Sequence, residues 1–195
     1  MFDYTQLVWT PRPLPCKMEN GSIEITTQPG TDLWKETMNH SSCVNAPVLQ
    51  MKSCEPNFSF TVKAAWQSSG LYDQCGLVMY LNENTWLKAS VEREDDEISH
   101  LGSVATNHGF SDWACTDVDA SVCEMWYRLT RNGSDFTVEY SRDGKKFSML
   151  RMCHMWECEG EVSFGLYACS PRDSSFTAVF TDLDFQAIAP NERAD

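Results

Sequence analysis

The chain has 195 residues, of which 42% are hydrophobic and 22% charged, a balance typical of a folded globular domain and not of a disordered chain. Its 15 basic residues against 28 acidic ones give a formal net charge of -13, which repels nucleic acid and anionic membrane surfaces. No apolar run approaches the roughly 20 residues that span a bilayer. The composition therefore disfavours both nucleic acid and membranes as partners.

The cysteines and the first residues indicate the compartment. The opening stretch, "MFDYTQLVWTPRPLPCKMENG", has neither a basic nor an apolar region, so we expect no secretory signal. Nine cysteines without C-x-x-C pairs predict reduced thiols in a cytoplasmic protein. Cys153 and Cys158 around His154 come closest to a metal site, but zinc sites need ligand pairs at shorter spacing. We expect neither a metal nor a cofactor.

The first clear strand is predicted at 58–66, where "FSFTVKAAW" alternates at the period of two that a half-buried strand shows. "GLVMYL" (76–81) is apolar on both parities, which is typical of a central strand. "WLKASVE" (86–92) and "ISHLGSVATN" (98–107) continue the extended pattern. All four segments therefore favour strands over helices.

Turns and further strands complete the predicted architecture. Asn132-Gly133 and Asp143-Gly144 supply the positive backbone torsions of tight hairpins. No window keeps apolar residues at helical spacing. Ten to fourteen short strands joined by turns predict an all-β sandwich of two antiparallel sheets, in one domain that spans 1–195 and ends in a polar tail at 189–195. The remaining strands are predicted at 126–130, 136–140, 147–151, 161–168 and 175–185.

The segment 86–92 raises the question of function. Trp86, Lys88 and Glu92 fall on one parity, whereas the small apolar residues between them fall on the other. For an isolated strand, the ordinary interpretation is a half-buried Trp86 beside solvated charges. The pattern recurs in "WYRLT" and in "SDWACTD" (111–117), however. Several strands that present an indole beside charged groups predict a polar-aromatic platform on an outer sheet face.

Five motifs resemble those of a known family. In this order, and between Thr26 and Phe185, the chain is similar to a domain-of-unknown-function family of concanavalin A-like jelly rolls that includes the fungal regulation-of-enolase protein. The resemblance implies a jelly-roll sandwich of two curved antiparallel sheets, as in legume lectins and glucanases. The motifs are "TDLW" (31–34), "YDQCGLVMYLNENTWLKASVE" (72–92), "VATNHGFSDW" (104–113), "WYRLTRNG" (126–133) and "YSRDGKKF" (140–147).

The platform and the family motifs together predict a binding site. Sugars offer apolar C–H faces to aromatic rings and hydroxyl groups to charged side chains, so a carbohydrate or another polyhydroxylated small molecule is the expected ligand. Where family members usually have Tyr or His after the first motif, this chain reads "KETMNHSSC", which leaves the partner of Trp34 open. The predicted ligand-binding residues are Trp34, Asp73, Gln74, Trp86, Lys88, Glu92, Asn107, Asp112, Trp113 and Arg128.

Two alternative functions stay open. Jelly-roll glucanases carry an E-x-D-x-x-E strand, which Glu92, Glu94 and Glu97 imitate. The middle residue is Glu and Glu97 lies past a turn, so we expect a protein without catalytic residues, and a glycoside hydrolase if it is an enzyme. The other alternative is a regulator that binds another protein through exposed apolar residues. The residues suited to such an interface are Met149, Met152, Met155 and Trp156.

Two carboxylates near the end of the chain have both a metal-binding and an ordinary interpretation. Asp182 and Asp184 lie on one parity of the last predicted strand, where carboxylates of related sandwiches bind a structural Ca²⁺. Carboxylates on a terminal strand are commonly just solvated, and we predict no metal there.

Overall fold

The computed structural model describes residues 2–68 and 70–189, and these contain sixteen strands and one 3-10 turn, Tyr4–Gln6. The strands are β1 (Val8–Thr10), β2 (Cys16–Glu19), β3 (Ser22–Thr26), β4 (Leu33–Lys35), β5 (Ser42–Val44), β6 (Val48–Ser53), β7 (Asn57–Trp66), β8 (Gln74–Asn82), β9 (Thr85–Arg93), β10 (Ile98–Asn107), β11 (Phe110–Asp119), β12 (Glu124–Asn132), β13 (Asp135–Ser141), β14 (Ser148–His154), β15 (Val162–Cys169) and β16 (Thr177–Ala187).

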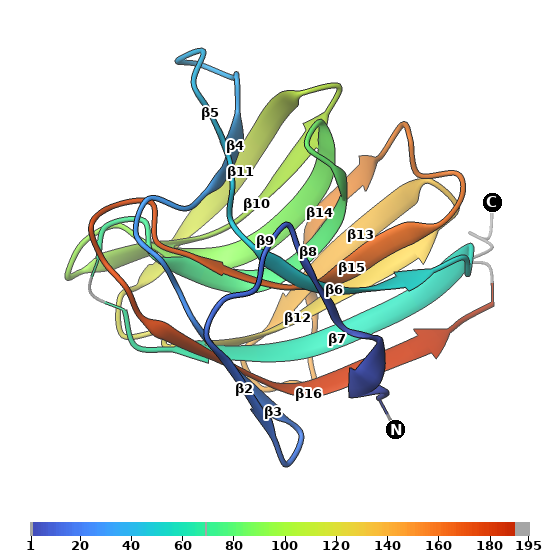
Figure 1. Ribbon diagram of the computed structural model, residues 1–195, viewed down its shortest axis with the longest axis horizontal. Coiled ribbons are helices and arrows are strands. Elements are labelled where there is room, and N and C mark those ends of the chain that lie inside the picture. The colour runs from blue at the N-terminus through green and yellow to red at the C-terminus, as the bar shows by residue number, and fades with distance from the viewer. Residues whose placement is uncertain (1, 69, 190–195) are drawn as a thin grey trace.

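The strands form two large antiparallel sheets, as predicted (Figure 1). Sheet A has the order β1-β6-β15-β8-β9-β10-β11, and sheet B has the order β14-β13-β12-β7-β16-β3-β2. The hairpin β4–β5 is a separate small sheet, which Figure 1 shows beside β10 and β11. No helix among the described residues is long and apolar enough to cross a membrane.

The main core lies between the two sheets and follows the predicted alternation. In β7, Phe58, Phe60, Val62 and Ala64 are fully buried, while the residues between them are half-buried on the outer face. In β9, the small apolar residues of 86–92 face this core, as their parity predicted. Each buried Phe or Val contributes roughly 1.5–3 kcal/mol relative to an exposed side chain. The parity of the sequence thus decides which side of each sheet joins the main core.

Sheet A is also covered on its outer face, which explains why β8 and β15 are apolar on both parities. A second apolar cluster lies there, formed by Leu33, Ala46, Val48, Val78, Trp86, Val104, Tyr167 and Cys169. Leu33 and Ala46 come from the β4–β5 hairpin and its exit, which cross over the sheet. The backbone N–H of Lys35 donates to Ser111 Oγ at 2.9 Å and ties the hairpin to β11. The hairpin therefore roofs part of the outer face.

Several local predictions need correction. Strand alternation did not predict the six short strands before Asn57, because strands of three to six residues are too short to show a period. The β12–β13 turn consists of Gly133 and Ser134, with Asn132 already paired to Asp135, so only Gly133 has a positive φ. Most of the predicted polar tail, from 190 onward, lies outside the described residues.

Candidate functional site

A cavity of about 660 Å³ opens on the outer face of sheet A. Its floor is made by β9 and β10, and β11, the β4–β5 hairpin and the loop after β15 contribute to its walls. This is the face on which parity placed Lys88 and Glu92. The cavity is lined by Asp32, Trp34, Asn39, Ser41, Cys43, Tyr72, Lys88, Glu92, Glu94, His100, Val104, Trp113, Pro171 and Arg172.

Lys88 forms the buried floor of the cavity. Its side chain is only 5% exposed, and its Nζ donates to Gln74 Oε1 at 2.9 Å and to Asp32 Oδ1 at 3.3 Å. Burial by itself lowers the pKa of Lys88, but the charges of Asp32 and Glu92 outweigh it and raise the pKa above its usual value. The raised pKa favours the protonated form of Lys88, whose charge is balanced by Asp32.

Gln74 organises the polar floor. Its Oε1 accepts hydrogen bonds from Lys88 Nζ, from Ser90 Oγ at 3.3 Å and from the Tyr167 hydroxyl at 3.0 Å. Its Nε2 donates to Glu92 Oε2, the residue paired with it across β8 and β9. Because Gln74 is 2% exposed, it acts by holding Lys88 and Glu92 in place and not by touching a ligand.

Glu92 carries a perturbed carboxyl group. Burial raises its pKa to about 6, an effect that the nearby charge of Lys88 only partly offsets. The residue lines the cavity, so this group can act there as a hydrogen-bond donor below that pKa and as an acceptor above it.

The raised pKa of Glu92 predicts a specific pH dependence of stability. The pKa is about 6 in the folded protein against 4.5 in the unfolded chain, so the folded state binds more protons between these values and stability falls as the pH rises through them. The loss amounts to about 2 kcal/mol. Glu92→Gln should abolish it. Urea unfolding of both proteins between about pH 4 and about pH 8 measures the difference.

Glu94→Gln is the matched control, because it removes a carboxyl group that lines the same cavity, with 40% of its side chain exposed, and leaves Glu92 in place. If the free energy of unfolding changes with pH in the same way for the wild type and for Glu92→Gln, Glu92 is not the group responsible for the pH dependence.

Acidic groups surround His100 at the β11 side of the cavity. His100 Nε2 lies 3.6 Å from Glu94 Oε2, and its Nδ1 lies 3.2 Å from Asp117 Oδ1. His100 is also the cross-strand partner of Glu92. This side of the cavity thus has three carboxyl groups around one imidazole.

Two indoles line the cavity. Trp34 extends from the β4–β5 hairpin, and Trp113 extends from β11 with 46% of its surface exposed. Trp113 lies over Gly102 of β10, where an added Cβ would come within 2.9 Å of the indole Nε1. The glycine lets the ring lie close to the sheet, which leaves the rest of the ring open to a ligand.

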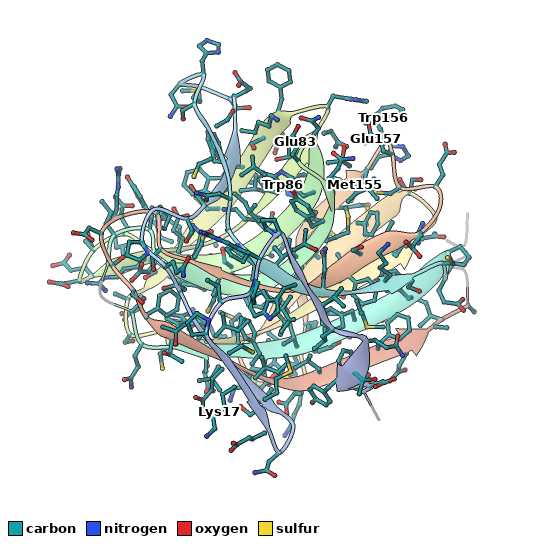
Figure 2. All side chains as sticks on the ribbon, viewed as in Figure 1. Lys17, Glu83, Trp86, Met155, Trp156 and Glu157 are labelled. Atoms are coloured by element: carbon teal, nitrogen blue, oxygen red, sulfur yellow. The ribbon has the colours of Figure 1, made fainter. Side chains whose placement is uncertain are left out.

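Trp86 is on the predicted face but does not line the cavity. It is 0% exposed and packs in the second apolar cluster under the β4–β5 hairpin (labelled in Figure 2). Its Nε1 has no hydrogen-bond partner among the described residues. The prediction that Trp86 stacks on a ligand is therefore wrong. The β4–β5 hairpin covers the ring, and the position of this hairpin cannot be predicted from the alternation of residues along a strand.

Four other predicted residues lie away from the cavity. Asn107 donates to the His154 carbonyl at 3.0 Å, and Asp112 pairs with Arg151 of sheet B at 2.9 Å, because both have the parity that points toward sheet B. Arg128 belongs to sheet B itself and pairs with Glu139. Asp73 is buried and accepts hydrogen bonds from the Gly70 N–H and from Ser174 Oγ, so it fastens two loops.

The structure brings together Trp34, Lys88, Glu92 and Trp113, with Gln74 directly beneath them. Residues absent from the prediction also line the cavity, notably Asp32, Tyr72, Glu94, His100 and Arg172. His100 could have been found, because it shares the parity of Gly102 and Val104 on the strand that follows Glu92. The hairpin and loop residues gave no such signal, since only tertiary contacts place them.

No group of three or more His, Cys, Asp or Glu residues within 2–68 and 70–189 is placed to hold a metal ion. Asp182 accepts a hydrogen bond from Trp126 Nε1 at 3.1 Å, and Asp184 accepts one from Gln186. All nine cysteines, each within the described residues, are free. Glu97 is exposed in the β9–β10 turn and does not line the cavity with Glu92 and Glu94.

Comparisons with known proteins agree with the fold. The Regulation of enolase protein 1 of Saccharomyces cerevisiae is 27% identical over 187 residues, covering 95% of this chain and 91% of that protein. A solved structure of a functionally unknown protein from Saccharomyces cerevisiae superposes with a TM-score of 0.88 at 25% identity, covering 96% of this chain and 100% of the other.

A more distant likeness concerns the fold alone. The GH43 protein BlXynB from Bacillus licheniformis superposes with a TM-score of 0.66 at 17% identity, over 87% of this chain and 34% of that chain. Together with the two antiparallel sheets, this likeness confirms the predicted concanavalin A-like jelly-roll sandwich. A family model described as "Protein of unknown function (DUF1349)" matches residues 9–188. The chain belongs to this family.

Proposed function

We propose that this protein binds a carbohydrate or a similar polyhydroxylated small molecule in the cavity on sheet A, without turning it over. The observation that carries the proposal is the pairing of two indole walls, Trp34 and Trp113, with the carboxyl group of Glu92 in one open cavity of about 660 Å³. That volume lies within the range of small-molecule sites, which is about 300–1,000 Å³.

The cavity offers both kinds of contact that a sugar needs. The indoles can stack on the C–H face of a pyranose, while Glu92, Asn39 and Ser41 supply hydrogen-bonding groups for hydroxyls. Lys88 and Gln74 keep Glu92 in a fixed position from below, which lowers the entropy lost on binding. We place this activity in the cytoplasm, in line with nine free cysteines.

Titration calorimetry against a panel of glycans and sugar phosphates tests the proposal. We expect at least one ligand to bind at millimolar concentration or below, and Trp113→Ala to weaken it about tenfold through loss of stacking. Trp156→Ala is the matched control, because this Trp is 62% exposed and lies outside the cavity. A panel without any ligand, or a ligand indifferent to Trp113→Ala, would rule out binding at this cavity.

A second candidate function is regulation through protein contact. It is supported by the name of the yeast relative and by exposed apolar side chains near β14, namely Met149 at 59%, Met152 at 48% and Trp156 at 62%. Met155 was predicted to belong to this surface, but it is fully buried in the main core and therefore does not contribute to the surface. Affinity purification compares the wild type with the double variant Met149→Glu, Trp156→Ala as the control. We expect the wild type to return a reproducible partner and the double variant to return none. If the wild type returns no reproducible partner, this function is excluded.

A further inference from the structure

We infer that the cavity on sheet A selects ligands that carry a protonated amine, such as an amino sugar, over neutral and anionic sugars. The inference rests on the proposed function and adds the charge of the ligand. It follows from the way in which the charged side chains around the cavity are already paired.

The positive charge on the floor of the cavity is committed to other groups. Lys88 is buried on the floor, where Asp32 and Gln74 occupy its Nζ at 3.3 and 2.9 Å. Arg172 is an exposed residue of the loop after β15, and its guanidinium carbon lies 5.1 Å from the ring centroid of Tyr72. An anionic ligand that reached Lys88 would have to displace Asp32 or Gln74, and it would also meet the carboxyl groups of Glu92 and Glu94.

The negative charges are only partly committed. Asp32 pairs with Lys88. Glu92 and Glu94 both line the cavity: Glu94 lies 3.6 Å from His100 Nε2, and Glu92 is the cross-strand partner of His100 and is also near the charge of Lys88. The Glu92 carboxyl accepts one hydrogen bond, from the neutral amide of Gln74. Asp117 adds a third carboxyl group on the far side of His100. An ammonium group placed here would donate a charge-assisted hydrogen bond to one of these carboxylates.

The aromatic walls favour the same kind of ligand. Trp113 lies next to this acidic side, with its ring centroid 5.9 Å from that of His100. An indole face attracts a cation as well as a C–H surface, and tryptophan is the strongest of the aromatic side chains in this respect. A sugar stacked on Trp113 can therefore direct an amino substituent toward Glu92 and Glu94.

The test uses matched sugars that differ in one substituent. For the gluco, galacto and manno configurations, calorimetry compares the 2-amino sugar, the parent hexose, the N-acetylated sugar and the uronic acid. We expect the amino sugar of at least one series to bind about tenfold tighter than its parent hexose, and the uronic acid to bind weakest. Acetylation removes the charge and should abolish the preference.

Glu94→Gln should reduce the preference for the amino sugar to about the level of the neutral hexose, because it removes a carboxylate from the acidic side. Glu83→Gln is the control: Glu83 is exposed in the turn between β8 and β9, outside the cavity, and its replacement changes the net charge by the same amount (Figure 2). It should leave the preference intact.

The possible failures are distinguishable. A hexose or uronic acid that binds as tightly as the amino sugar, and that loses affinity in Trp113→Ala, would overturn the amine preference and leave the proposed carbohydrate binding standing. An equal loss of preference in Glu94→Gln and Glu83→Gln would show a diffuse effect of net charge and overturn the inference as well. If no member of any series binds, the amine preference falls, and the proposed carbohydrate binding falls with it only if the wider panel of glycans and sugar phosphates also yields no ligand.

Discussion

Replacing Trp86 with alanine should destabilise the protein by about 4 kcal/mol, the largest effect that we expect from any single substitution in the outer face of sheet A. The indole is fully buried between β9 and the β4–β5 hairpin, where its neighbours include Leu33, Val78 and Val104. Its removal leaves a large cavity and separates the hairpin from the sheet. The free energy of unfolding, obtained from urea titration, measures the loss.

Two variants make the result specific. Trp86→Phe should cost less than half as much, because it keeps most of the apolar volume and Nε1 has no hydrogen bond to lose among the described residues. Trp113→Ala should change stability by only about 0.5 kcal/mol, since that ring is 46% exposed. A loss below about 1 kcal/mol for Trp86→Ala would mean that the hairpin does not depend on this contact.

Replacing Asp32 with alanine should destabilise the protein by about 3 kcal/mol, because it leaves the ammonium group of Lys88 buried without its counter-ion. The effect is smaller than for a fully buried pair, since the Asp32 side chain is 23% exposed. Asp32 also accepts the N–H of its neighbour Leu33, so the variant weakens the entry to β4 as well.

The double variant Asp32→Ala, Lys88→Met separates these two effects. Removing the unpaired charge together with its partner should recover part of the stability lost in Asp32→Ala, because apolar residues often replace a buried ion pair at little cost. A double-mutant cycle gives the coupling directly. A double variant less stable than Asp32→Ala would show that the loss comes from the backbone of the hairpin and not from the charge of Lys88.

Both substitutions bear on the design of binding experiments. Trp86 packs under the β4–β5 hairpin that covers the sheet, and Asp32 pairs with Lys88 on the floor of the cavity. Variants of either residue can therefore lose a ligand merely because the hairpin is loosened. Trp113→Ala and Glu94→Gln are better probes, because each replaces an exposed side chain that no apolar cluster requires.

Strand parity could have sharpened part of the binding-site prediction. Asp112 and Trp113 are adjacent in β11 and therefore point to opposite faces of sheet A, so only Trp113 can share a face with Lys88. Asn107 follows Thr106, the partner of Trp86, and points the other way for the same reason. Adjacency alone shows that Asp112 and Trp113 cannot share a face. Which of them shares the face of Lys88 depends on the register of β9, β10 and β11, and the correction of Arg128 depends on the place of β12 in sheet B.

The amino-acid sequence alone determined that this chain forms a two-sheet sandwich and that the small residues of 86–92 face its core, because a period of two fixes the faces of a strand whatever its neighbours are. It could not determine whether Trp86 or Trp113 is the exposed indole, since both lie on the outer face of sheet A. Only the tertiary structure decided this, by laying the β4–β5 hairpin over Trp86 through contacts between residues far apart in the chain. Burial on the outer face of a sheet depends on what crosses it, and strand periodicity carries no information about that.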